Sequence, residues 1–315
     1  MKYMVGLKTG DTQLLECILE NTEHIHEVYF SWGELPNGRS NQLQSDSFAP
    51  WILQDIQRES LKTLSQAGVA LNLLFNGNCY GKDAQARSFF HKIGTIIDHV
   101  GETYGLRSVT TTSPLIAKFI KNNFPGLEVR ASVNMEIGTV EAMSYMAAYF
   151  DSFYMQRELN RDFNAIRKLH AWCTENSKGL FALANSGCLN HCPARNFHDN
   201  LVAHESEISQ MDNAYDFRGI CREYLASGEH YKDVYSVTNF IRPEDVSKYD
   251  PYFTAVKLAT RIHKHPRAVV NSYIRGRYSG DLLQLLEPAH SIYPWVLENG
   301  EPPVLKKIDK QITGL

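Results

Sequence analysis

The sequence predicts a TIM-like (β/α)8 barrel, regular or distorted, and three observations lead to this prediction. Short apolar or β-branched runs alternate with amphipathic helical windows, which favours parallel strands joined by right-handed helical crossovers. The chain has 315 residues, which is enough for one barrel with insertions. An open doubly wound sheet is the alternative fold, but no G-x-G-x-x-G turn supports it.

Each strand of the expected barrel is a short run of apolar or β-branched residues. The segment 70–75 (ALNLLF) is apolar along most of its length, as is typical of a strand buried on both faces. A further strand is expected at 234–240 (VYSVTNF), packed on the rim of the barrel. The barrel strands are expected at 3–7, 27–31, 70–75, 108–112, 128–133, 152–155, 180–184 and 254–259.

The helices that separate the strands carry recognisable start and stop signals. Asp11 is expected to cap the first helix, and Ser113 with Pro114 is expected to begin the helix after the fourth strand. Gly68 is expected to end the helix before the third strand. The spacing of apolar residues predicts helices at 51–66, 89–104, 139–149 and 162–173.

We expect one domain, because the chain has no internal repeat, low-complexity tract or convincing linker. The barrel is expected to span 1–287, with a cysteine-bearing insertion at 188–232 after the seventh strand. Residues 288–315 are expected to form a C-terminal tail packed on the barrel. The insertion is far longer than an ordinary loop between a strand and a helix, which indicates a functional role.

The composition excludes several classes of protein. Hydrophobic residues make up 43% and charged residues 21% of the chain, as in folded globular proteins rather than disordered or coiled-coil ones. The 32 basic and 35 acidic residues leave a net charge of -3, so no global field holds nucleic acid or an anionic membrane. No apolar stretch could span a bilayer and the first residues show no secretion signal, so we expect a cytoplasmic protein without a membrane partner.

Four of the six cysteines are expected at one face of the barrel. In a TIM barrel the loops that follow the strands build the active site, and these cysteines lie after the third strand or in the long insertion after the seventh. Of the other two, Cys173 is expected at the opposite face and Cys17 in the core. The four at the active face are Cys79, Cys188, Cys192 and Cys221.

Four reduced thiols at one rim suit a 4Fe-4S cluster or a closed zinc site. Zinc knuckles usually contain paired C-x2-C units, whereas the spacing C-x3-C-x28-C with a remote fourth cysteine favours a cluster held by several loops. Two other interpretations stay open. One is that the thiols are unrelated, and the other is a mixed zinc site of Cys188, Cys192, His198 and His204.

Three arginines are candidates for anchoring an anionic substrate, because each follows a predicted strand and a guanidinium group can hold a carboxylate bidentately. They are Arg157, Arg242 and Arg261. The alternative for Arg242 is an ion pair with Glu244 or Asp245. His198 is a candidate for moving a proton near neutral pH. The basic stretch 251–280 could meet phosphate or RNA bases, although a solvated helix face is the simpler interpretation.

The segment CLNHCPARNFHDNLVAHE, preceded by FDSFYMQREL and followed by NFIRPEDV and KLATRIHKHP, resembles peptidase family U32, the collagenase-like peptidases. The resemblance covers the chain from about residue 70 to residue 286, and it implies a TIM-like barrel. It also implies that the peptidase name can mislead. The family includes cytoplasmic bacterial proteins that hold a 4Fe-4S cluster and take part in dioxygen-independent hydroxylation of ubiquinone precursors or of tRNA and rRNA bases.

In those family members a thiolate early in the chain joins others from a late loop. This arrangement resembles Cys79 joining Cys188, Cys192 and Cys221. The chain departs from the RNA-modifying members in the x3 spacing of its central cysteines and in lacking their extra C-terminal domain. The resemblance therefore does not transfer a substrate.

Together these observations predict an iron-sulfur protein that carries out oxygen-independent hydroxylation, or a related redox modification, of an anionic, aromatic or nucleobase substrate. Two rival hypotheses stay open. One is a peptidase or other hydrolase that uses Cys188 with His198, or a metal-bound water, although the sequence has no H-E-x-x-H or G-x-S-x-G motif. The other is a non-catalytic, cluster-bearing subunit that works with a paralogous partner chain.

Overall fold

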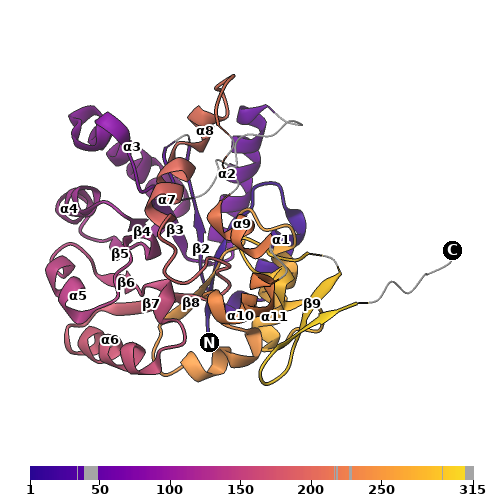
Figure 1. The fold of residues 1–315 in the computed structure, drawn as a ribbon. Coiled ribbons are helices and arrows are strands. Elements are labelled where there is room, and N and C mark those ends of the chain that lie inside the picture. The colour runs from indigo at the N-terminus through magenta and orange to yellow at the C-terminus, as the bar shows by residue number, and fades with distance from the viewer. Residues whose placement is uncertain are drawn as a thin grey trace.

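The computed structural model describes residues 1–33, 35–38, 49–215, 217, 219–226, 229–292 and 294–308. Its centre is a closed barrel of eight parallel strands, in which each strand pairs with the next and the last pairs with the first (Figure 1). This confirms the predicted TIM-like barrel, and all eight strands lie where the sequence predicts them. They are β1 (Tyr3–Gly6), β2 (Ile25–Phe30), β3 (Leu71–Phe75), β4 (Leu106–Thr111), β5 (Glu128–Ala131), β6 (Ser152–Tyr154), β7 (Gly179–Leu183) and β8 (Ala255–Leu258).

Helices surround the barrel and connect its strands (Figure 1). Those that cover the barrel are α1 (Thr12–Glu20), α2 (Pro50–Gln66), α3 (Arg87–Tyr104), α4 (Pro114–Asn123), α5 (Val140–Met146), α6 (Phe163–Glu175) and α11 (Pro266–Arg275). Four short helices lie between β7 and β8, namely α7 (Arg195–Ala203), α8 (Glu205–Ile208), α9 (Ile220–Ala226) and α10 (Val234–Val237). Turns of 3-10 helix occupy Thr22–His24, Gly81–Gln85, Val133–Met135, Arg157–Leu159, His230–Asp233, Pro243–Tyr249 and Leu282–Leu285.

The helix boundaries follow from the capping residues in the sequence. The Asp11 side chain accepts a hydrogen bond from Leu14 N at 2.9 Å, which satisfies an N–H group in the first turn of α1. Ser113 does the same for α4, where Pro114 needs no partner for its nitrogen. Gly68 adopts a φ of +74° just after α2, a conformation that favours glycine.

The additional strand expected at 234–240 is wrong. Val234–Val237 forms α10, and the only strand-like feature among the described residues of this segment is an isolated bridge between Leu189 and Thr238. Burial explains the difference, because Tyr231 and Val234 are buried three residues apart, which is a helical spacing. β-branched residues favour strands only weakly, and here packing outweighs that preference.

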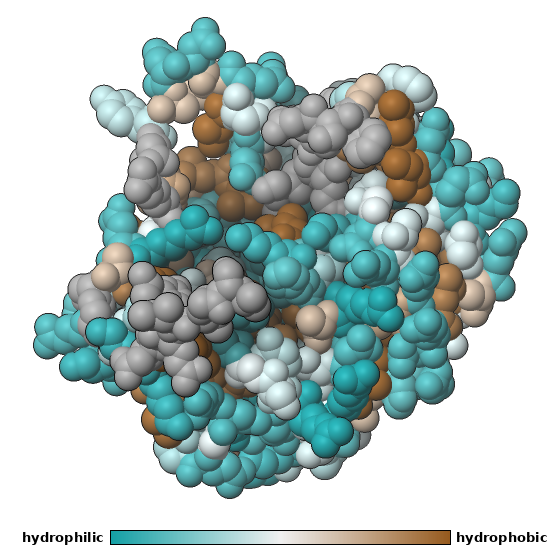
Figure 2. Space-filling view, turned by 90° about the vertical axis from the view of Figure 1, so that its right-hand side faces the viewer, coloured by the Kyte–Doolittle hydropathy of each residue, from teal (hydrophilic) through white to brown (hydrophobic). Residues whose placement is uncertain are grey.

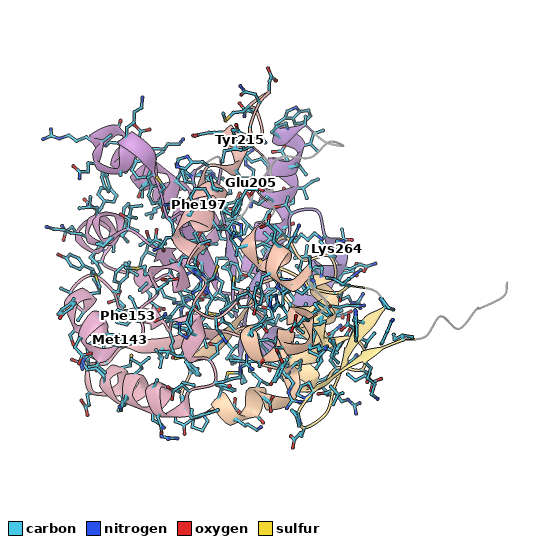
Figure 3. All side chains as sticks on the ribbon, in the orientation of Figure 1. Met143, Phe153, Phe197, Glu205, Tyr215 and Lys264 are labelled. Atoms are coloured by element: carbon cyan, nitrogen blue, oxygen red, sulfur yellow. The ribbon has the colours of Figure 1, made fainter. Side chains whose placement is uncertain are left out.

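The core of the molecule has two apolar layers. One lies between the barrel and the surrounding helices, where Met143 and Phe153 are found (Figure 3). The other fills the inside of the barrel, so the barrel is a packed core and not a pore. The side chains of this inner layer come from Met4, Tyr29, Leu74, Val133, Tyr154, Phe181, Leu183 and Ala255.

A polar layer fills the barrel nearer the N-terminal ends of the strands. The Arg130 guanidinium is fully buried and forms ion pairs with Glu27 and Glu128. Its Cζ lies 4.1 Å from the centre of the Phe181 ring. Ser108 donates a hydrogen bond to the second oxygen of Glu27 at 3.1 Å. The strands β2, β4 and β5 are therefore linked inside the barrel by one buried charge network.

The last part of the described chain forms a small hairpin, in which β9 (Trp295–Glu298) pairs antiparallel with β10 (Val304–Lys307). It lies on the same side of the molecule as α10 and α11 (Figure 1). Arg242 Nη1 donates to Asn299 Oδ1 at 3.1 Å, and Asp281 accepts a hydrogen bond from Leu297 N at 3.0 Å. Residues 309–315 of the expected tail lie outside the described residues.

The surface on this side of the molecule is mostly hydrophilic, with apolar side chains in separate groups (Figure 2). Scattered apolar side chains are ordinary on a protein surface. Within the described part of the chain, no helix is both long and apolar enough to cross a membrane.

Two buried histidines make the stability depend on pH. His263 and His290 are 2% and 5% exposed, and burial lowers the pKa of each below its ordinary value. The unfolded chain binds protons near pH 6.5 while the folded chain does not, so stability is present above that pH and is lost below it. When the pH is lowered from about 7.5 to about 5.5, we expect the urea concentration at the unfolding midpoint to decrease. The decrease is expected to be smaller in His290→Gln. A midpoint that does not change over this range would contradict the expectation.

Candidate active site

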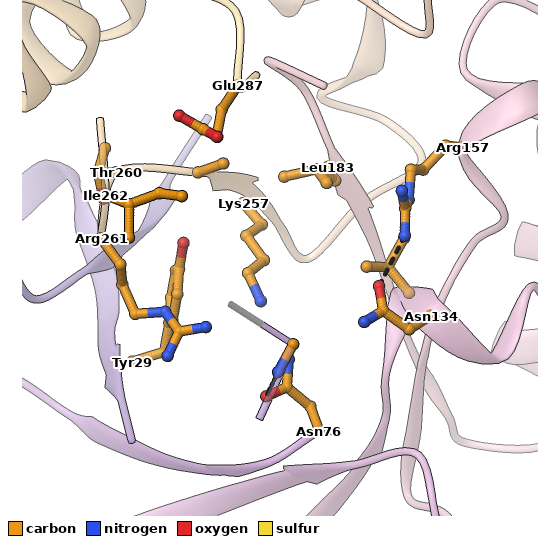
Figure 4. A pocket seen from close by; sticks show the side chains of 13 residues that line it. Tyr29, Asn76, Asn134, Arg157, Leu183, Lys257, Thr260, Arg261, Ile262 and Glu287 are labelled. Atoms are coloured by element: carbon orange, nitrogen blue, oxygen red, sulfur yellow. Dashed lines mark hydrogen bonds between the residues drawn. The ribbon is translucent and has the colours of Figure 1, made fainter. Parts of the chain in front are cut away.

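A pocket opens at the C-terminal ends of the barrel strands (Figure 4). This is the face at which TIM barrels build their active sites. Side chains from β2, β7 and β8 form its floor, and the loops after the strands form its walls. The pocket is lined by Tyr29, Gly38, Asn76, Val133, Asn134, Arg157, Leu183, Lys257, Ala259, Thr260, Arg261, Ile262 and Glu287.

Two cations from β8 and the loop after it lie beside the same aromatic ring. Lys257 Nζ is 4.0 Å from the centre of the Tyr29 ring, and the Arg261 guanidinium is 6.0 Å from it. Both side chains are well buried, at 7% and 5% exposure. The Tyr29 hydroxyl donates to the carbonyl of Leu258 at 2.7 Å, and Arg261 donates to Asn37 Oδ1 at 3.2 Å. The pocket floor is therefore positively charged and partly aromatic.

Arg157 connects this pocket to the cysteine segment. It begins the 3-10 turn after β6 and is 3% exposed. Its Nη2 donates to Asn134 Oδ1 at 2.6 Å (Figure 4), and its Nη1 donates to Cys188 Sγ at 3.2 Å. The Arg157 guanidinium group therefore contacts both a pocket residue and a thiol of the cysteine segment.

Three of the four predicted cysteines lie near one another. The pKa of Cys221 is raised, first by burial and then by the neighbouring Cys188 and Cys192 thiols. All three are partly exposed in the insertion between β7 and β8. Such mutual repulsion between thiolates is relieved when a cation binds between them.

The fourth cysteine, Cys79, contacts a histidine instead. Its pKa is lowered, mainly by a hydrogen bond to His204 and also by one from the backbone N of Gly81, at 3.4 Å from Cys79 Sγ. His204 Nδ1 lies 3.1 Å from Glu207 Oε2, and the pKa of His204 is raised by Cys79. Among the described residues, which include all four of these cysteines, no three or more Cys, His, Asp or Glu side chains are placed so that they could hold a metal ion.

The insertion is tied to the barrel by Arg195, in the first turn of α7. This guanidinium forms ion pairs with Glu158 and with Glu136, the latter at 3.0 Å. It also donates to the carbonyl of Leu189 at 2.8 Å. Although burial alone would raise the pKa of Glu158, the Arg195 charge holds it below its ordinary value. Phe197, in the same helix, points away from the barrel with Tyr215 beyond it (Figure 3).

The other predicted site residues are placed as follows. Arg242 does not line the pocket; its Nε pairs with Asp245 at 2.5 Å, the ion pair stated above as its alternative. His198 lies 5.6 Å from the Phe217 ring, between ring centres, and is also outside the pocket lining. Arg261 lines the pocket, as does Arg157.

The excluded cysteines are buried away from the thiols of the insertion. Cys173 Sγ contacts Met143 Sδ at 3.8 Å, and Cys17 Sγ contacts Asn271 Oδ1 at 3.4 Å. Burial raises the pKa of both thiols. Neither is suited to act as a ligand or nucleophile in this environment.

Several pocket residues were not predicted from the sequence. Lys257 had the clearest signal, because a lysine within an otherwise apolar strand is expected to be functional or paired. Tyr29 also lies within a predicted strand, at an inward-facing position. Asn76, Asn134 and Glu287 lie in loops, and nothing in their local sequence distinguishes them from ordinary loop residues.

Comparison with known structures finds a similar fold. A solved structure of a U32 peptidase aligns with a TM-score of 0.57 and 12% sequence identity, covering 82% of this chain and 91% of that chain. An L-Ala-D/L-Glu epimerase aligns with a TM-score of 0.38 and 9% identity, covering 64% of this chain and 54% of that one. A muconate lactonizing enzyme from Pseudomonas putida aligns with a TM-score of 0.37 and 13% identity, covering 58% and 46% of the two chains.

By sequence, no protein-family model matches the chain, and no curated protein matches it significantly. The structural comparison shows a shared fold that these sequence searches do not detect. The U32 peptidase aligns over most of both chains. The chain has the fold of a U32 peptidase, which confirms at the level of structure the resemblance drawn from its cysteine segment.

Proposed function

We propose that this chain is an enzyme whose central pocket binds an anionic aromatic or nucleobase substrate beside a 4Fe-4S cluster. The observation that carries the proposal is the position of Arg157, which lines the pocket and donates a hydrogen bond to Cys188 Sγ. The substrate pocket and the thiols thus share one side chain. The reaction class that this arrangement supports best is oxygen-independent hydroxylation or a related redox modification.

The pocket lining supports an anionic, planar substrate. Lys257 and Arg261 provide two buried positive charges, and Arg157 a third. A carboxylate or similar anion bound among them forms charge-assisted hydrogen bonds in a site that excludes water. The Tyr29 ring lies beside both cations of β8 and its loop, where an aromatic substrate can pack against it.

The thiols suit the proposed cluster by their chemistry, although among the described residues no three such side chains are placed to hold a metal ion. Thiolates are the protein ligands of 4Fe-4S clusters, and Cys188, Cys192 and Cys221 lie within electrostatic reach of one another. In the proposal Cys79 is the fourth ligand and exchanges its contact with His204 for iron. When bound, such a cluster supplies one-electron transfer. Zinc on the same thiols is the alternative.

The proposed reaction can be written so that its atoms and electrons balance. With water as the oxygen donor, a C–H bond of the substrate breaks, a C–OH bond forms, and two protons and two electrons leave. The electrons require an external one-electron acceptor protein, and a paralogous chain is one such partner. Glu287 lines the pocket, where a carboxylate can take up a proton. His198, in α7, remains the candidate for releasing protons from the cysteine side.

Anaerobic purification followed by iron, acid-labile sulfide and visible absorption measurements tests the cofactor. We expect about four irons and about four sulfides per chain. The Cys221→Ser variant is expected to lose them. Cys173→Ser is the matched control, because that thiol is buried in the core against Met143. Full iron content in Cys221→Ser, or none in the wild type, would refute the proposed ligand set.

A thiol hydrolase is the second candidate function, and one observation favours it. Cys79, His204 and Glu207 form a chain of contacts in which an imidazole can activate a thiol and a carboxylate can orient the imidazole. This candidate predicts that iron-free protein releases peptide fragments, that Cys79→Ser abolishes the release, and that Cys221→Ser leaves it unchanged. The cluster proposal predicts no such release from any of these proteins.

A further inference from the structure

A second, open cavity lies beside the central pocket. Ile262 and Glu287 line both the pocket and the cavity, so these two residues lie between them. Its other sides come from α9, from the loop between β8 and α11, and from the segment after Leu282–Leu285. The cavity is lined by Arg222, Ile262, His263, Lys264, His265, Gln284, Glu287, Pro288, Ala289 and Ser291.

The lining of this cavity is predominantly basic. Arg222 and Lys264 carry full positive charges, and Lys264 lies on the outer edge of the barrel near α9 (Figure 3). His265 adds a group that can be protonated, whereas Glu287 is the only acidic side chain in the lining. The net charge around the cavity therefore favours an anion.

His263 presents a hydrogen-bond donor within this basic cluster. Its Nδ1 accepts a hydrogen bond from His265 N at 3.0 Å, which places the proton of the neutral ring on Nε2. Nε2 is buried and makes no hydrogen bond of proper geometry, although the backbone of Gln284 lies nearby. A buried donor without a good partner is costly, and an anion in the cavity would satisfy it.

The N-terminus of α11 lies next to the cavity lining in sequence. This helix has ten residues and begins just after His265, which lines the cavity. No side chain caps its N-terminus. The unsatisfied N–H groups and the positive end of the helix dipole favour anions, and barrels often bind phosphate beside the loop after β8.

We propose that this cavity binds the phosphate group of a phosphate monoester whose aromatic or nucleoside part extends into the central pocket. The proposal rests on the proposed function for the position of that aromatic part, and it narrows the substrate class to phosphorylated aromatic molecules. Arg222 and Lys264 contact the phosphate oxygens as charged donors, and His263 Nε2 and the α11 N-terminus complete the set.

The test is calorimetric titration of the full anaerobically purified chain with inorganic phosphate and with phenyl phosphate. Loss of two charged donors is expected to weaken binding of both probes at least about tenfold in the Arg222→Gln/Lys264→Gln double variant. Phenyl phosphate is expected to bind at least about tenfold more tightly than inorganic phosphate. Lys257→Met is expected to weaken the binding of phenyl phosphate but not of inorganic phosphate, because Lys257 lines the central pocket and not the second cavity.

The matched control is Arg275→Gln, which removes a positive charge from the other end of α11. Equal weakening by the control and the double variant, or no weakening by the double variant, would overturn the phosphate site. Equal affinity for the two probes would overturn the proposal that the aromatic part of the ligand extends into the central pocket. Iron is measured on the same samples, so a colourless protein that still binds phosphate refutes the cluster and leaves the phosphate site intact.

Discussion

Replacing Arg130 by methionine is expected to destabilise the folded protein by about 3–5 kcal/mol. Arg130 is fully buried and is the partner of Glu27, whose side chain is 2% exposed. Without the guanidinium group, the Glu27 carboxylate either stays buried without its counter-charge or takes up a proton. Both outcomes raise the free energy of the folded state, whereas the carboxylate is hydrated in the unfolded chain and is not affected. Urea unfolding followed by circular dichroism measures the change in the free energy of unfolding.

The double variant Glu27→Gln/Arg130→Met tests whether the loss of stability comes from the unpaired Glu27 charge or from the changed packing around position 130. Glutamine at this position can still accept the hydrogen bond from Ser108 that Glu27 accepts at 3.1 Å. The double variant removes the fully buried carboxylate, and the Glu128 carboxylate that remains is 32% exposed. The double variant is therefore expected to be more stable than Arg130→Met by at least about 1 kcal/mol. If the double variant is the less stable of the two, the uncompensated charge is not the cause.

Replacing Arg195 by methionine is expected to destabilise the insertion by about 3–5 kcal/mol and to release it from the barrel. Arg195 pairs with Glu158, whose side chain is 2% exposed, and with Glu136. The remaining Glu158 carboxylate would be buried without a cation. We expect faster reaction of Cys192 and Cys221 with a thiol reagent, because the loop that carries them is no longer held by Arg195. Under the proposed function the variant also contains less iron.

An exposed arginine provides the control for this experiment. Arg58 pairs with Asp55 at 2.9 Å on the surface of α2, where the two side chains are 45% and 58% exposed. Arg58→Met is expected to change stability by less than about 1 kcal/mol. Arg195→Lys keeps the charge without the planar fork and is expected to lie between the wild type and Arg195→Met. Unchanged thiol reactivity in Arg195→Met would contradict the proposed attachment.

The barrel could be predicted because its signals are local. Each strand is a short apolar run whose neighbours in sequence are helices, and parallel pairing then follows from chirality and connection length. Asp11 and Ser113 act as caps through hydrogen bonds three residues away, so the sequence contains the whole contact. The segment 234–240 could not be predicted in this way. The helix that forms at its start depends on which of its side chains the rest of the protein buries.

The site could be predicted only in part because it is assembled from distant loops. Arg157 and Arg261 follow strands, and the barrel rule is enough to place them at the pocket. For Arg242 the rule does not apply, because the segment before it is not a strand, and Asp245 three residues away holds its guanidinium group in an ion pair. The contact between Cys79 and His204 joins residues far apart in sequence, and no spacing pattern contains it. Cluster binding by the four cysteines stays a prediction.

The two hydrogen bonds of Arg157 imply reciprocity between the pocket and the thiol. One bond goes to Asn134, which lines the pocket, and the other to Cys188 Sγ. A ligand that draws the guanidinium group toward the pocket weakens its bond to sulfur, and a change in charge on sulfur alters the affinity of the pocket for anions. By thermodynamic linkage the two effects are equal in free energy. Arg157 thus couples ligand binding in the pocket to the charge on the Cys188 sulfur.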